Sequence, residues 1–304
     1  MNEGMKHLIR YFPSYVGLGL LWVLHWLPLP VLRALGRTLG YLFFLLGKER
    51  REVALTNLRL CFPELGEAER VRLARRSVAN FACSLLDRPL LWWAPRQRLM
   101  QMLHIEGAEH LAGQTEADAK RPVILFGMHF VGLEAGATRL AMERQLSTVY
   151  SNQKNPVFNA VLLVGRVRFN GGIAFSRQEG IRKVIKTLKA GTPLYYLPDM
   201  DFGPRDAIFA PFFGVQAATI TGLSRMARAT GARVLPCISR MTGTGYDFII
   251  FPALEHFPGE TVEADAARMN ALVEEQVRQM PEQYFWLHKR FKTRPPGEER
   301  IYKK

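Results

Sequence analysis

His129 and Glu134, five positions apart, form a candidate pair for acid–base catalysis. They lie in the segment VILFGMHFVGLEAG, residues 123–136. An imidazole whose one ring nitrogen is held by a carboxylate can take a proton from a hydroxyl with its other nitrogen. No serine or cysteine lies between the two residues to act as a nucleophile, so the hydroxyl activated by such a base belongs to a substrate. The pair therefore indicates direct transfer of a group to that hydroxyl, without a covalent intermediate on the protein.

The spacing of this pair requires a turn. Five positions exceed the three or four that align residues on one helical face, and an odd spacing puts residues on opposite faces of a strand. Residues 123–127 are typical of a buried strand, and a helix is expected near 132–145. We therefore expect His129 and Glu134 within hydrogen-bond distance at the carboxyl end of a strand, where α/β sheets bind ligands. A lone histidine that caps the helix is the alternative interpretation.

The chain around this pair has the alternation of an α/β protein. From residue 104 onward, short β-type runs alternate with helical ones, which predicts a largely parallel central sheet flanked by helices. The expected strands are 123–127, 147–151, 171–175, 193–198, VLPCISRM and YDFIIFP, and the later helices are 218–231 and 263–280. We assign residues 48–304 to one domain, in which 48–103 form a helical section rich in arginine and 104–304 form the α/β core. The arginines indicate either a solvated face or a surface for an anionic membrane or acidic protein.

The first 47 residues differ from the rest in hydropathy. Residues 11–32 contain no Lys, Arg, Asp or Glu, and a second apolar piece, TLGYLFFLLG, ends at Gly47. About 20 apolar residues suffice to span a bilayer, but Pro28 and Pro30 interrupt the run. We expect residues 1–47 to form a helical membrane anchor, either one tilted span or a kinked helix pair in one leaflet. A buried hairpin of a soluble core is the alternative.

The composition limits the classes of partner. The chain has 304 residues, is 48% apolar and carries a net charge of +14. This apolar content excludes a disordered chain, and the charge favours an anionic partner. The three cysteines show neither metal spacing nor a disulfide pattern, so we expect a reducing compartment, no metal and no cofactor. The sequence has no helix-turn-helix motif, no zinc-binding motif and no aromatic signature for binding single-stranded nucleic acid, so we do not expect a nucleic-acid partner.

Several segments, in the same order, resemble the late acyltransferases of lipid A biosynthesis, the lauroyl and myristoyl type within the wider H-x4-D/E acyltransferases. They are the apolar N-terminus, REVALTNLRLCFPEL (51–65), GMHFVGLE (127–134), NPVFNAVLLVGRVRF (155–169), YYLPDMDFGPRDAIFAPFFG (195–214), ATITGLSRMARATGARVLP (218–236) and PEQYFWLHKRFKTRP (281–295). The resemblance implies a glycerolipid-acyltransferase-like fold and a membrane-bound O-acyltransferase. Such an enzyme moves a fatty acyl chain from acyl carrier protein to a hydroxyl of a hydroxyacyl chain. The acceptor is a lipid A precursor of the Kdo-linked lipid IVA type, in lipopolysaccharide biosynthesis.

The resemblance also implies roles for particular residues. His129 matches the catalytic histidine and Glu134 its partner acid. Arg166 is expected to contact a phosphate or the reacting carbonyl, and Arg177 corresponds to the arginine of the second acyltransferase block. Guanidinium groups suit bidentate contact with phosphate. From the residues alone, a surface basic pair of Arg166 with Arg168 remains the alternative.

Asp199 and Asp201 lie in the third block, which reads LPDMDFG here. Glycerol-phosphate acyltransferases have a sequence like FPEG at this place, so the departure favours a lipid A-type acceptor. The resemblance implies that both aspartates bind substrate. Residue types alone leave open that they only stabilise a turn before Gly203 and Pro204.

The implied partners are anionic, in agreement with the net charge. They are the acyl carrier protein thioester, the phosphorylated lipid A precursor and anionic lipid of the bacterial inner membrane, with the catalytic domain facing the cytoplasm. One alternative is an acyltransferase for another membrane acceptor, a lysophospholipid or a glycolipid. Another is a non-catalytic basic protein of the membrane surface, which would explain the charge but not His129 and Glu134 at a strand–helix junction.

Overall fold

A computed structural model describes the backbone of residues 3–302 and the side chains of residues 9–302. Its N-terminal part is helical, as predicted, although residues 1 and 2 of the expected anchor lie outside the described part. Pro28 and Pro30 flank the start of the second helix, where a fixed φ and a missing N–H are tolerated. The five helices are α1 (Glu3–Leu24), α2 (Leu29–Leu46), α3 (Lys48–Cys61), α4 (Glu67–Trp93) and α5 (Arg96–Met102).

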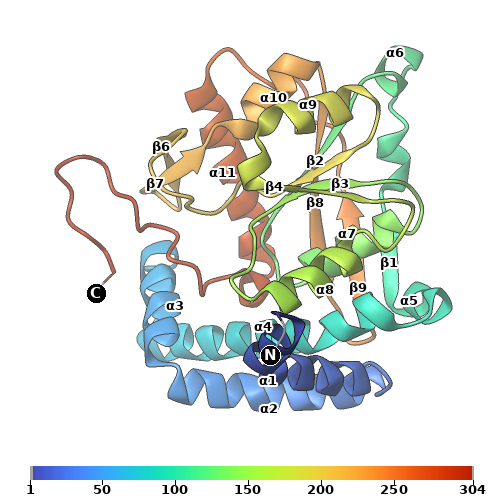
Figure 1. Ribbon diagram of the computed structural model, residues 1–304. Helices are drawn as coiled ribbons and strands as arrows, with labels where there is room; N and C mark the ends of the chain where they lie inside the picture. Colours follow the sequence, from blue (N-terminus) through green and yellow to red (C-terminus); the bar gives the residue numbers. More distant parts are fainter. Residues whose placement is uncertain (1–2, 303–304) are drawn as a thin grey trace.

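The centre of the molecule is a seven-stranded sheet (Figure 1). Its order is β1-β9-β8-β2-β5-β3-β4, and all neighbours are parallel except β8 and β9. This confirms the predicted α/β fold with a largely parallel sheet. The strands are β1 (Leu103–Glu106), β2 (Val123–Gly127), β3 (Ser147–Tyr150), β4 (Ile173–Ser176), β5 (Leu194–Tyr196), β8 (Arg233–Met241) and β9 (Tyr246–Ile250).

Helices cover both faces of the sheet, and β2 shows how. Ile124 and Phe126 pack in one core cluster with side chains of α9, α10 and α11, whereas Leu125 packs in another with Leu140 of α7. Alternate residues of a strand point to opposite faces, so a strand covered on both sides is apolar throughout. The helices beyond the sheet's first strand are α6 (Glu116–Ala119), α7 (Leu133–Ala141), α8 (Pro156–Arg166), α9 (Ile181–Lys189), α10 (Gly222–Thr230) and α11 (Val262–Gln279), with 3-10 turns at Ala108–Leu111, Arg177–Glu179 and Pro281–Gln283.

A separate hairpin, β6 (Ala207–Phe212) and β7 (Val215–Ile220), corrects one prediction. The helix expected over 218–231 begins only at Gly222, because Thr219 and Ile220 belong to β7 and pair with β6. Phe213 and Gly214 close the hairpin with φ of 51° and 74°, and positive φ at both loop residues is the type I′ turn that suits two-residue hairpins. The pairing partner therefore overrides the helical pattern.

α2 packs lengthwise on α4 through glycines. A Cβ atom at Gly36 would lie 2.7 Å from the Cα of Cys83, and one at Gly40 would lie 2.5 Å from the Cα of Ala79. Those distances are shorter than real Cβ contacts, so the absence of a side chain is what lets the two helices approach. α2 is thus attached to the body of the protein along one face.

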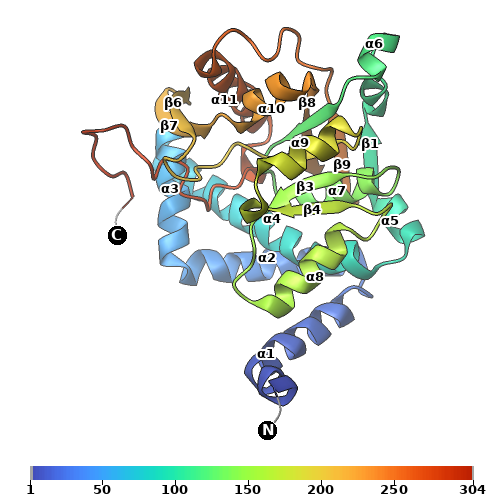
Figure 2. The ribbon, with the colours of Figure 1, turned by 45° about the horizontal axis from the view of Figure 1, so that its top comes forward.

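The opposite face of α2 and much of α1 expose apolar side chains. Within residues 3–302, α2 is the one helix long and apolar enough to cross a membrane. Figure 1 shows α1 and α2 at the same end of the molecule, and in the turned view of Figure 2 α1 projects from the body. The exposed apolar side chains are Ile9, Phe12, Tyr15, Val16, Leu20, Trp22, Val23, Val31, Leu35, Leu39, Tyr41, Leu42, Phe43, Leu45 and Leu46.

Candidate active site

His129 lies in the turn between β2 and α7, as the sequence predicts. A C-terminal segment holds this turn: the N–H of Phe285 donates to the carbonyl of His129 (3.0 Å), and the N–H of Val131 donates to the carbonyl of Gln283 (2.9 Å). A Cβ atom at Gly132 would lie 2.7 Å from the ring of Tyr246. The glycine therefore allows the end of the turn to approach β9 closely.

The imidazole of His129 is paired with Asp199. The distance from Nδ1 to Oδ1 is 2.6 Å, and the backbone N–H of His129 donates to Oδ2 at 2.9 Å. The hydroxyl of Tyr284 donates to the same Oδ2 at 3.2 Å. The contact follows from the sheet register: Phe126 of β2 pairs with Tyr196 of β5, and each site residue lies three positions further along its chain.

This pairing determines which ring nitrogen meets a substrate. Burial alone raises the pKa of Asp199, but the charge of His129 and its hydrogen bonds outweigh burial, so the pKa lies below the ordinary value of 3.8. Asp199 is therefore an anion that accepts a hydrogen bond from Nδ1. Nε2 has no hydrogen-bond partner among the residues that the structure describes, and it is the nitrogen left to act as a base.

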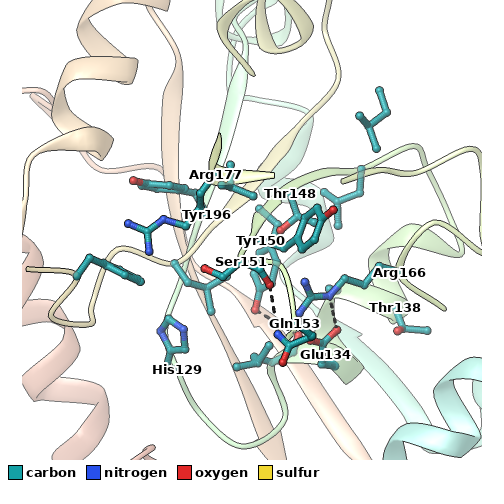
Figure 3. A pocket seen from close by; sticks show the side chains of 18 of the residues that line it. His129, Glu134, Thr138, Thr148, Tyr150, Ser151, Gln153, Arg166, Arg177 and Tyr196 are labelled. Atoms are coloured by element: carbon teal, nitrogen blue, oxygen red, sulfur yellow. Dashed lines mark hydrogen bonds and ion pairs between the residues drawn. The ribbon is translucent and has the colours of Figure 1, made fainter. Parts of the chain in front are cut away.

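The predicted hydrogen bond between His129 and Glu134 is wrong. Both oxygens of Glu134 pair with Arg166, the last residue of α8: Nε lies 3.1 Å from Oε2, and Nη2 contacts Oε1 (Figure 3). The first turn of α7 directs Glu134 toward α8, whereas the carboxylate after β5 reaches the imidazole. Burial raises the pKa of Glu134, but the charge and hydrogen bonds of Arg166 lower it more, so the pKa lies below its ordinary value of 4.5.

His129, Glu134 and Arg166 line one cavity of about 250 Å³. Much of its remaining wall is apolar, including Leu133, Ala137, Leu146, Val149, Ile173 and Leu197. A base and an ion pair thus lie beside a space that suits a hydrocarbon chain. Among the described residues, no group of three or more His, Cys, Asp or Glu side chains is arranged to hold a metal ion.

The other predicted site residues have different surroundings. Arg177 lines the cavity, and its guanidinium lies 4.4 Å from the centroid of the Phe202 ring. Asp201 is buried: its oxygens accept hydrogen bonds from the N–H of Gly203 (2.8 Å) and from the N–H and hydroxyl of Thr293 (2.7 and 2.9 Å). The geometry of Asp201 is therefore that of the turn-stabilising alternative rather than of a substrate ligand.

Two further residues complete these surroundings. Arg168 donates to the carbonyls of Leu91 and Ala94 (3.1 and 2.6 Å), so it ties the end of α8 to α4 instead of entering the cavity. Tyr284, which the sequence does not single out, is buried against Asp199. It lies in the PEQYFWLHKRF segment that carries the resemblance, but its residue type alone gives no sign of this contact.

The chain is similar to known proteins along most of its length. The family described as bacterial lipid A biosynthesis acyltransferase matches residues 3–293. The chain belongs to this family. It is 38% identical to the lipid A biosynthesis lauroyltransferase of Escherichia coli over 291 residues, which cover 95% of this chain and 94% of the relative. It is 33% identical to the palmitoleoyltransferase of the same organism (96% and 95% covered) and 34% identical to the myristoyltransferase (90% and 84% covered).

A solved structure gives a more distant likeness. The 1-acyl-sn-glycerophosphate acyltransferase of Thermotoga maritima matches with 15% identity and a TM-score of 0.37, over 82% of this chain and 97% of that one. Family membership shows that the chain is an acyltransferase of lipid A biosynthesis, with a role among the late acylations.

Proposed function

We propose that the protein transfers a fatty acyl chain from the thioester of acyl carrier protein to a hydroxyl on a hydroxyacyl chain of a lipid A precursor. The acceptor is a phosphorylated disaccharide of the Kdo-linked lipid IVA type. The observation that carries this proposal is the His129–Asp199 pair, 2.6 Å apart, with His129 at the wall of a partly apolar cavity. Family membership supports the lipid A acceptor rather than a lysophospholipid.

In this reaction His129 acts as a base and then as an acid. Its Nε2 takes the proton of the acceptor hydroxyl while the oxygen attacks the thioester carbonyl. Asp199 stabilises the imidazolium that forms, as the buried aspartate does in Ser-His-Asp catalytic triads. When the C–S bond breaks, the imidazolium returns the proton to the thiolate of the carrier. An ester has formed, a thioester has been cleaved, and no group remains on the protein.

Glu134 and Arg166 are proposed to act together: Glu134 holds the guanidinium of Arg166, which stabilises the negative charge of the reacting carbonyl or of a substrate phosphate. Their ion pair joins α7 to α8 at the cavity wall and uses Nε and Nη2 of the guanidinium. Nη1 is then available to the thioester carbonyl or to a phosphate of the acceptor. Backbone N–H groups in the first turn of α7 would share the charge of the tetrahedral intermediate. Arg177, in the same wall, is proposed to bind the phosphorylated part of the substrate.

The enzyme is proposed to work at the cytoplasmic face of the bacterial inner membrane. We infer that α1 and α2 lie in one leaflet instead of crossing it, because α2 packs on α4 and α4 carries charged residues along its length. A buried ion pair between Arg33 of α2 and Asp87 of α4, 3.0 Å apart, fixes this arrangement. The exposed apolar faces of α1 and α2 would enter the lipid, as interfacial helices do.

One experiment tests the reaction and the base together. Membranes containing the protein are given carrier thioesters of several chain lengths and a tetra-acylated lipid A precursor, and acylated product is measured by mass spectrometry. We expect product from the parent and from His104→Ala, a control at an exposed histidine of β1, but none above background from His129→Ala. Equal product from His129→Ala would contradict the mechanism, and none from the parent would contradict the substrate assignment.

A further inference from the structure

A second cavity adjoins the one that contains His129. Its volume is about 690 Å³, and it shares lining residues with the first, among them Val149, Arg177 and Phe202. Apolar side chains of α9 and α10, such as Ile181, Val184 and Met226, line its other walls. These walls suit a ligand chain that is mostly uncharged. A flexible arm entering between α9 and α10 would therefore lead toward the base.

The wall of this second cavity is basic. Arg177, Arg205 and Arg225 line it, and the carboxylate among the lining residues is that of Asp206, 3.5 Å from Arg225. Arg177 and Arg205 have no carboxylate within salt-bridge distance among the described residues. Thr221 precedes α10, but its hydroxyl donates to the carbonyl of Asp206 (3.3 Å) and does not cap the helix. Uncapped N–H groups and arginines together suit a phosphate.

The outer surface beside this cavity is also basic. α9 carries Arg182, Lys183, Lys186 and Lys189 and no acidic residue. Lys183 pairs with Glu179 at 2.8 Å, whereas the other three have no carboxylate partner among the described residues. The helix buries an apolar stripe, so its exposed side is almost purely cationic. Such a surface is complementary to an acidic protein.

We propose that α9, α10 and the second cavity form the docking site of the acyl donor's carrier protein. An acidic helix of the carrier binds along α9, and Arg205 and Arg225, which line only the second cavity, hold the phosphate of its phosphopantetheine arm. The arm then delivers the thioester to His129. This inference rests on the proposed function, since it assigns a binding site to the donor named there.

The arrangement of the fold favours a protein partner over a lipid for this surface. Figures 1 and 2 both show α9 and α10 toward the end of the molecule opposite to α1 and α2, whose exposed apolar faces would meet the membrane. A membrane bound by α1 and α2 does not reach α9 in that arrangement. The acceptor therefore enters from the membrane side, and the carrier docks from the aqueous side.

The test measures binding of the carrier without turnover. Fluorescence anisotropy gives the Kd of labelled carrier protein for the parent and for Lys186→Glu/Lys189→Glu at low ionic strength. We expect Kd to rise about tenfold or more, since opposite charges would be replaced by like charges at the interface. The matched control is Arg72→Glu/Arg75→Glu on the exposed side of α4, which has the same charge change, and its Kd should equal that of the parent.

A second arm tests the phosphate site. The parent should bind the carrier with its phosphopantetheine arm more tightly than the carrier without it, and Arg205→Ala should remove most of that preference. Thermal unfolding checks that all variants fold.

An unchanged Kd in the α9 variant, or an equal loss of affinity in the α4 control, would overturn the docking site. The docking site would also be overturned if the α9 variant changed only the KM for the phosphorylated acceptor, or only the binding to anionic vesicles, and left the Kd of the carrier unchanged. Failure of the parent to transfer acyl chains would refute the proposed reaction, while Kd would still decide the docking site.

Discussion

Replacing Asp199 by asparagine is the substitution whose effect the structure specifies most closely. Three donors converge on the two carboxylate oxygens: Nδ1–H and the backbone N–H of His129, and the hydroxyl of Tyr284. Asparagine offers one acceptor oxygen. If that oxygen takes the place of Oδ2, where two donors meet, the amide NH2 faces Nδ1 and forces the ring proton onto Nε2. The imidazole then has no free Nε2 lone pair to accept the hydroxyl proton.

The expected loss in kcat is about 10³- to 10⁴-fold, or roughly 4–5.5 kcal/mol, the size found when a buried triad aspartate becomes asparagine. The assay is single-turnover acyl transfer from a carrier thioester at saturating acceptor. Asp201→Asn is the matched control, because this neighbour is equally buried but bonds Gly203 and Thr293. We expect it to lose about 1–3 kcal/mol of stability while its kcat stays close to that of the parent. A kcat for Asp199→Asn that matches that of the control would show that Asp199 does not determine the tautomer of His129.

Three further predictions concern stability. Glu134→Gln leaves the partly buried Arg166 without its charge partner and should lower the free energy of unfolding by about 3–5 kcal/mol in chemical denaturation. Because the pKa of Glu134 is depressed, its contribution to stability is full above pH 4.5 and is lost as the pH falls through the folded-state pKa. The parent should therefore lose stability more steeply than the variant in that pH range. Parallel pH curves would contradict this. Gly40→Leu should lower the free energy of unfolding by more than the 1–3 kcal/mol typical of overpacking, since the larger side chain forces α2 away from α4. An unchanged denaturation midpoint would contradict this prediction. Arg33→Ala should cost about 3–5 kcal/mol and Arg37→Ala, at an exposed position, less than about 0.5; equal effects would argue against the buried ion pair.

The strand and turn around His129 could be predicted because local sequence determines them. The apolar run 123–127 ends at a histidine, and a helical pattern follows. The partner of His129 could not be predicted in this way, because Asp199 lies 70 residues away and meets it through the pairing of β2 with β5. Strand order is a property of the whole sheet, and alternation of strands and helices leaves it open. Glu134 is nearer to His129 in sequence, but it lies in the first turn of α7 and pairs with Arg166 instead.

The hairpin and the N-terminal helices show the same limit. Residues 218–220 join a helical pattern in sequence, but the strand that pairs with them, β6, decides their conformation. The apolar residues of α2 predict a helix in lipid or in a core, and they do not reveal that Gly36 and Gly40 bring one face against α4. In both cases the decisive contact joins segments separated by a turn or a whole helix. Local periodicity carries no information on such contacts.

In the proposed mechanism His129, oriented by Asp199, acts only as a base and then an acid, and the acyl chain passes directly from a carrier thioester to a hydroxyl of an acceptor acyl chain. The measurement is mass spectrometry of both enzyme and acceptor during a single turnover with stoichiometric protein. We predict that the acceptor gains one acyl group, with fragmentation placing the new ester on an acyl-chain hydroxyl, while the mass of the enzyme stays constant at every time point. Transient addition of an acyl chain to the protein would contradict direct transfer, and a new ester on a sugar hydroxyl would contradict the assigned acceptor group.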